Sequence, residues 1–67
     1  MSVARVTEVI SSSATSFDDA IQTAIDRANK TLKNVQGAWI ESQKVDIENG
    51  AITAYRVALK ITFILDD

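Results

Sequence analysis

The sequence has no cysteine and no histidine among its 67 residues. Without cysteine the chain can form no disulfide, no thiolate nucleophile and no cysteine-based zinc site. Without histidine it also lacks the usual general base and the commonest ligand of transition metals. The remaining acids are scattered Asp and Glu residues, and none is paired at a spacing that suggests a general acid and base. We therefore expect a protein that is not an enzyme, with no catalytic residues and no metal ligands.

Other absences narrow the expected partners and location. The formal net charge is −2 and acidic and basic residues are interspersed, so there is no basic stripe for nucleic acid. No apolar run approaches the length needed to span a membrane, and the N-terminus has no signal-peptide pattern. We therefore expect a cytoplasmic protein that binds neither nucleic acid nor a membrane.

The chain is short for a stable single core. It should form one domain over residues 1–67, and at this size a core is marginal without a disulfide, a metal or oligomerisation. Cysteine and histidine are both absent, so oligomerisation is what remains. The sequence therefore predicts that the chain associates with copies of itself.

The longest alternating pattern is the C-terminal stretch from Ala51 to Asp67. Its odd positions from Tyr55 to Leu65 are large and apolar, whereas its even positions are small, charged or mixed. This two-residue period predicts a strand with one face built for a core. The strand is longer than a domain of this size needs, so it must curl around its packing partner or reach beyond the subunit.

The N-terminal residues predict a strand followed by a polar loop. Val3 to Ile10 is rich in β-branched residues, which favour strands, and Ser11 to Ser16 is typical of a loop. The serines could instead form a phosphate-binding loop. Such loops need glycine for close backbone approach, however, and no glycine lies between Met1 and Gln36.

The segment from Phe17 to Lys33 predicts an amphipathic helix, because its apolar residues recur at spacings of three and four. Ser16 can cap the first turn, and Asp18 and Asp19 lie where the helix dipole favours negative charge. Alanines on the apolar stripe would let a sheet approach closely. A membrane surface is the alternative partner for this stripe, but the polar face carries acids as well as bases.

The segment from Val35 to Ile47 predicts a second strand whose alternation slips after Ile40. A β-bulge or tight coil between Glu41 and Lys44 would return the apolar residues to one face. The Asn49-Gly50 pair that follows predicts a hairpin with a type I′ turn.

Together these elements predict an α+β fold with the order β-α-β-β. A right-handed crossover and the hairpin place the last strand between the other two. The result is a three-stranded antiparallel sheet of order 1-3-2, wrapped on one amphipathic helix, with its other face bare. The residues expected on the bare face are Gly37, Trp39, Glu41, Ala54, Arg56, Ala58 and Lys60.

Trp39 on a bare sheet face has two interpretations. Tryptophan is enriched in subunit interfaces because of its large contact area, and an exposed indole is also a platform for a flat ligand. Both interpretations remain open from the residues alone.

A chain of this order and length closely resembles the dodecins over essentially its whole extent. The resemblance is carried by TSF before AIQTAIDRANKTLKNV, a strand containing GAWIE, the Asn-Gly hairpin and the terminal AYRVALKITFILDD. It implies a small non-enzymatic protein that stores or sequesters a flavin, such as FMN, riboflavin or FAD, in a hollow homododecamer. A dodecin-like structural or storage shell that takes a cation or another small molecule instead of flavin is the alternative.

The resemblance also implies the binding residues. In flavin-binding dodecins a Trp early in strand two stacks on the isoalloxazine ring, and a Gln in strand three hydrogen-bonds the pyrimidine edge. Those positions correspond here to Gly37 and Arg56, while Trp39 lies one strand period further on and on the same face. A guanidinium donates only, so Arg56 suits an anion, a carbonyl group or Glu41. The implied cofactor-binding residues are therefore Trp39, Arg56, Gly37 and Glu41.

Overall fold

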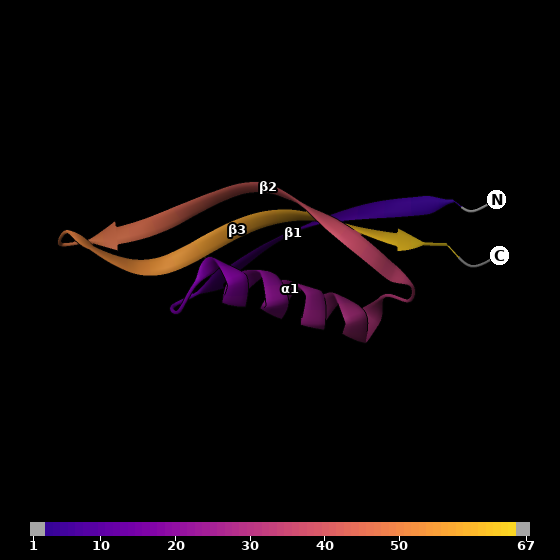
Figure 1. The fold of residues 1–67 in the computed structure, drawn as a ribbon, viewed down its shortest axis with the longest axis horizontal. Helices are drawn as coiled ribbons and strands as arrows, with labels where there is room; N and C mark the ends of the chain where they lie inside the picture. The colour runs from indigo at the N-terminus through magenta and orange to yellow at the C-terminus, as the bar shows by residue number, and fades with distance from the viewer. Residues whose placement is uncertain (1–2, 66–67) are drawn as a thin grey trace.

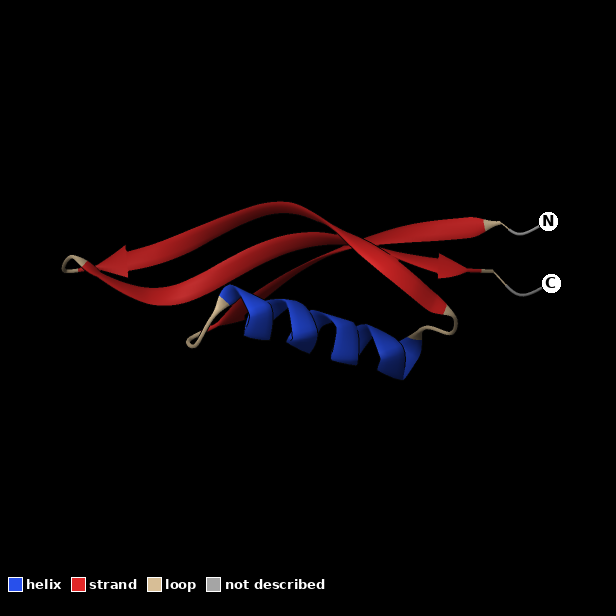
Figure 2. Ribbon diagram, in the orientation of Figure 1, coloured by secondary structure: helices blue, strands red, loops and turns tan. Residues whose placement is uncertain are grey.

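The protein is described by a computed structural model over residues 3–65. Its elements are β1 (Ala4–Ser13), α1 (Phe17–Thr31), β2 (Val35–Glu48) and β3 (Ala51–Ile64). The strands form one antiparallel sheet of order β1-β3-β2, and α1 lies along one face of it (Figures 1 and 2). The predicted fold class and strand order are confirmed. The last two residues of the predicted C-terminal strand, and both ends of the predicted domain, lie outside the described residues.

The core lies between α1 and the centre of β3. Val57, Leu59 and Ile61 are almost completely buried, as the alternation of β3 predicts. They pack against a stripe of three alanines on the helix, Ala20, Ala24 and Ala28. The small side chains of the helix let it lie close to the sheet. Leu65, which was expected on the same buried face, is instead 41% exposed, because β3 ends at Ile64 and the helix does not cover residues beyond it.

The helix begins where it was predicted and ends earlier. The Oγ of Ser16 accepts a hydrogen bond of 3.0 Å from the backbone N–H of Asp19, which caps the first turn. The helix was expected to continue to Lys33, but it ends at Thr31. Leu32 adopts an extended backbone and packs against the core, so the burial of its side chain redirects the chain before the predicted end.

Strand β1 is longer than predicted. Ser11, Ser12 and Ser13 were expected in a loop, yet they pair with residues 55–57 of β3. Backbone pairing to a long neighbouring strand overrides the weak strand propensity of serine. The strand ends at the buried Ser13, whose Oγ donates to Asp19 and accepts from two backbone N–H groups of the following turn.

The predicted bulge and hairpin are both present. The β2–β3 register shifts between Ile40 and Ser42, which makes Glu41 the extra residue. The shift lets Ile40 pair with Leu59 and Val45 pair with Tyr55, so both remain on the helix side of the sheet. At the turn, Asn49 has φ 52° and Gly50 has φ 80°, the two positive values that a type I′ turn needs.

The chain is elongated, with extents of 51 × 19 × 13 Å, because the β2–β3 hairpin reaches well past the helix (Figure 1). Its radius of gyration is 13.8 Å, against about 11 Å for a compact chain of this length. Its accessible surface of 4942 Å² is also larger than the roughly 4,200 Å² expected for a monomer of 7.3 kDa. The single chain therefore exposes more surface to solvent than a compact monomer of this mass would. None of the helices described is long and apolar enough to cross a membrane.

Candidate functional site

The face of the sheet opposite α1 is organised around Lys60 of β3. The β2–β3 register places Trp39 directly beside Lys60, and the β1–β3 register places Glu8 on its other side. These three side chains therefore lie in one row across the sheet. Gly37 pairs with Thr62 and belongs to the next row along the strands.

Trp39 borders an open hollow on this face. The hollow has a volume of about 680 Å³, and its walls are formed by Val6, Glu8, Trp39, Ile40, Glu41 and Lys60. The Trp39 residue is 61% exposed, so most of its surface remains accessible to a ligand or a partner. A second hollow of about 590 Å³ adjoins the first and shares Glu8, Glu41 and Lys60 with it.

Two carboxylates surround the Lys60 ammonium. Its Nζ lies 2.5 Å from Oε1 of Glu41 and 3.9 Å from Oε1 of Glu8. The bulge at Glu41 explains the closer contact, because an extra residue in a strand redirects its side chain. The hydrogen bond and the charge of Glu41 raise the pKa of Lys60 above its ordinary value, and Glu8 adds a smaller effect. Lys60 is therefore a cation throughout the neutral range, held beside the indole.

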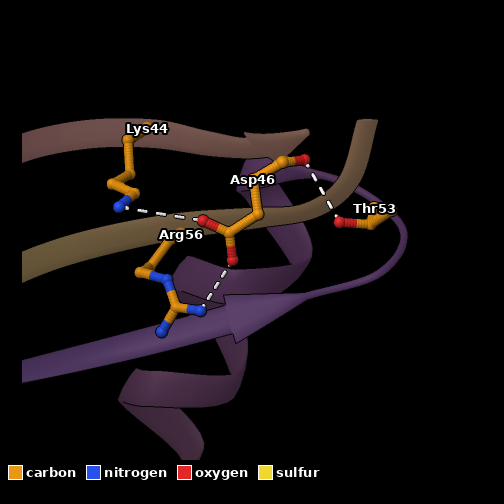
Figure 3. Close-up of polar contacts among 4 residues, drawn as sticks. All are labelled: Lys44, Asp46, Thr53 and Arg56. Atoms are coloured by element: carbon orange, nitrogen blue, oxygen red, sulfur yellow. Dashed lines mark hydrogen bonds and ion pairs between the residues drawn. The ribbon is translucent and has the colours of Figure 1, made fainter. Parts of the chain in front are cut away.

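Arg56 belongs to a separate cluster near the hairpin (Figure 3). Its Nη2 donates to Oδ2 of Asp46 at 2.7 Å, and Nζ of Lys44 lies 3.8 Å from the other oxygen of that carboxylate. Thr53 donates to the backbone oxygen of Asp46 at 3.2 Å. The hydrogen bond from Arg56 lowers the pKa of Asp46 below its ordinary value.

Of the three kinds of partner expected for Arg56, an anion, a carbonyl group or Glu41, the structure shows an anionic carboxylate other than Glu41. Arg56 contacts Asp46, and Glu41 contacts Lys60. The physical reason is the register: Arg56 is four residues before Lys60 along β3, which is about 13 Å at 3.3 Å per residue. Of the expected site residues, the structure brings Trp39 and Glu41 to one hollow and leaves Arg56 outside it.

Gly37 lies near Trp39, and the space next to its Cα is open to solvent. A shallow hollow of about 330 Å³ is lined by residues 36–39 and Thr62, and a Cβ added to Gly37 would meet no atom within 4 Å. Its φ is not among the positive values of the chain, so the backbone does not require glycine there. A larger side chain at this position would fit the single chain without a clash.

Sequence reasoning did not identify Glu8 or Asp46 as partners of the site residues. Alternation alone placed Lys60 on the bare face, but its pairing with Glu8 depends on the β1–β3 register, which no local motif fixes. The bulge also moves Lys44 and Asp46 onto the face of Arg56. In residues 3–65 no three His, Cys, Asp or Glu side chains come together in a way that could hold a metal ion.

Comparisons with known proteins point to one family. The family model described as Dodecin matches residues 3–66. The dodecin from Streptomyces coelicolor has a TM-score of 0.93 at 32% sequence identity, covering 98% of this chain and 94% of that one. A mutant of the Thermus thermophilus dodecin has a TM-score of 0.94 at 27% identity, covering 100% of both chains. A protein named calcium dodecin, from Mycobacterium tuberculosis, is 29% identical over 63 residues, which are 94% of this chain and 89% of that protein.

Proposed function

The chain belongs to the dodecin family, and from this premise we propose that it forms a homododecamer that stores or sequesters a flavin without chemically transforming it. FMN, riboflavin and FAD share the isoalloxazine ring and are the candidate ligands. The observation that carries the proposal is the exposed indole of Trp39, which borders a hollow on the sheet face that the helix leaves uncovered. A flat aromatic ligand that stacks on an indole gains contact area on its whole face.

Association with further copies follows from the surface of the chain. The large exposed residues of the uncovered face and of the hairpin include Val6, Ile10, Trp39, Ile47 and Ile52, each between 44% and 70% exposed. Ile47 and Ile52 are cross-strand partners near the hairpin turn, beyond the reach of the helix. Exposed apolar surface of this kind marks a site of interaction. The exposure of this surface in the single chain supports the closed assembly that we propose.

The residues expected to bind flavin then have distinct roles. Trp39 provides the stacking platform, and Gly37 leaves room beside it. Glu41 lines the same hollow. Arg56 and Lys44 carry two positive charges against the single negative charge of Asp46, and this surplus suits the phosphate of FMN.

A second candidate function is a shell that holds a cation, and the relative named calcium dodecin is the observation that favours it. Calcium takes six to eight oxygen ligands, usually with several carboxylates among them. Glu8 and Glu41 are the two carboxylates of the hollow, but Lys60 already lies within 4 Å of both. A cation would have to displace this ammonium group, so flavin is the better supported ligand.

Titration of FMN with the purified assembly tests the proposal. Quenching of the flavin fluorescence is expected on binding, together with light scattering that reports a dodecamer. Trp39→Ala should weaken binding by roughly 5- to 150-fold, which corresponds to about 1–3 kcal/mol of lost stacking. Trp39→Phe, which keeps an aromatic face, should retain more of the affinity. Absence of FMN binding by the intact assembly would exclude the flavin function. A stable monomer at micromolar concentration would exclude the assembly.

The cation alternative has its own measurement. If the shell holds calcium, added calcium should raise the melting temperature of the assembly while FMN leaves it unchanged. The flavin proposal expects the reverse, because a ligand that binds only the folded state stabilises it by RT ln(1 + L/Kd), where L is the free ligand concentration. Arg56→Gln should also weaken FMN binding more than riboflavin binding if Arg56 contacts the phosphate.

A further inference from the structure

A bound flavin presents both acceptors and a donor at its pyrimidine edge, because an N–H lies between two carbonyl groups. A protein site that reads this edge needs at least one donor and one acceptor. Arg56, at the position where the family has Gln, has only donors, and its guanidinium is engaged by Asp46. Arg56 therefore cannot accept from the ring N–H, and an acceptor on this face has to be sought among other residues.

Glu41 and Lys60 supply the missing combination next to the indole. Lys60 is the direct cross-strand partner of Trp39, and such partners have Cβ atoms about 5 Å apart. Glu41 contacts Lys60 through Oε1, which leaves its second carboxylate oxygen as an additional acceptor. The ammonium has three donors, one of which points to Glu41. All three residues line the same hollow.

The pair is also accessible. The side chains of Lys60 and Glu41 are 39% and 45% exposed, so a ligand can reach them without breaking into the core. Their mutual contact orients both groups before a ligand arrives, which reduces the entropy lost on binding. A hydrogen bond to a charged partner is also stronger than one between neutral groups.

We infer that the Glu41–Lys60 pair reads the pyrimidine edge of a flavin stacked on Trp39, with Lys60 donating to a ring carbonyl and Glu41 accepting from the ring N–H. This inference rests on the proposed flavin function and assigns its specificity to residues other than the one at the family's Gln position. The ligand class that follows is any flat ring with a carbonyl beside an N–H. Methylation of that nitrogen removes the donor and introduces a clash with the carboxylate.

The test compares two ring compounds without side chains, lumiflavin and 3-methyllumiflavin, by fluorescence titration of the intact assembly. Wild type should prefer lumiflavin by about 10- to 150-fold, the range for a hydrogen bond to a charged group. Glu41→Ala should reduce this preference to about twofold or less by removing that hydrogen bond. Glu48→Ala is the matched control, because Glu48 lies on the same strand at the hairpin and outside the hollow. It should keep the full preference.

Further variants identify which groups are responsible. Lys60→Met should weaken the binding of both compounds to a similar degree, because both keep their carbonyl groups. Loss of the preference in Glu8→Ala instead of Glu41→Ala would overturn the assignment to Glu41. Tighter lumiflavin binding by Arg56→Gln, with Glu41→Ala unchanged, would place the edge recognition at Arg56 and overturn the inference.

The failure of this inference is separable from failure of the flavin function. Equal binding of the two compounds by wild type would overturn the recognition of the pyrimidine edge by Glu41 and Lys60 and leave stacking on Trp39 intact. Binding of neither compound would overturn both. Light scattering on each variant verifies that the assembly is retained, and equal binding of the two compounds by wild type overturns the inference even if a variant fails to assemble.

Discussion

Truncation of Leu59 to alanine tests the core on which the binding face depends. Leu59 is 1% exposed and is one of three large side chains that are almost fully buried, with Val57 and Ile61. The other buried residues of its core cluster are two β-branched residues with stiff side chains and a stripe of alanines that have no side-chain freedom. They can collapse only slightly into the space that is left. We therefore expect a loss in the upper part of the usual range, about 3–5 kcal/mol.

That loss is large for a chain of this size, whose total unfolding free energy is on the order of 3–10 kcal/mol. Urea unfolding followed by far-ultraviolet circular dichroism, at a fixed protein concentration, measures it. Leu65→Ala is the matched control, because Leu65 is 41% exposed and lies just beyond β3. It should cost about 1 kcal/mol or less. Similar losses for the two variants, or a loss below about 1 kcal/mol for Leu59→Ala, would refute the placement of the core.

Three other changes test the helix, the turn before it and the charge clusters. Ile21→Asp should prevent folding and assembly, because Ile21 packs against the core and an unpaired carboxylate there costs several kcal/mol. The control variant Thr23→Asp should fold and assemble, because Thr23 is exposed. Circular dichroism measures the folding of each variant, and light scattering measures its assembly. Ser13→Ala removes a buried hydroxyl with three hydrogen-bond partners and should cost about 1–3 kcal/mol in urea unfolding. Because the pKa of Asp46 is lowered in the folded chain, its contribution to stability is present above the ordinary value of 3.8 and is lost as the pH falls through the folded value. Asp46→Asn should flatten the acid side of the stability profile, and an unchanged acid side would contradict the pairing with Arg56.

Much of the fold was predictable because local patterns and the tertiary structure agree. The alternation of β3, the helical spacing of the alanines and the Asn49-Gly50 turn each specify their element without reference to the rest of the chain. The errors occur where packing competes with local preference. Ser11 to Ser13 join β1 because β3 offers partners, and Leu32 leaves the helix where its partly buried side chain packs against the core.

The candidate site was predictable only in part, because it depends on register across strands far apart in sequence. Alternation placed Trp39 and Lys60 on one face, and a slip in the pattern predicted a bulge between Glu41 and Lys44, which the register places at Glu41. No local signal paired Glu8 with Lys60, however, or separated Arg56 from Glu41 by its contact with Asp46. Such pairings require both the bulge position and the register of β1 on β3.

The strand order also decides when the chain can fold during synthesis. β3 is the last of the four described elements to be made, yet it lies at the centre of the sheet between β1 and β2. Until residues 51–64 have left the ribosome, the first two strands have no partner and the alanine stripe of α1 has no core to cover. Pairing of β1 with β3 must then close a loop that runs at least from Ser13 to Tyr55, and contacts so far apart in sequence form slowly. The sheet can therefore form only after β3 has been made, and a chain that is cut short within β3 has no sheet to complete.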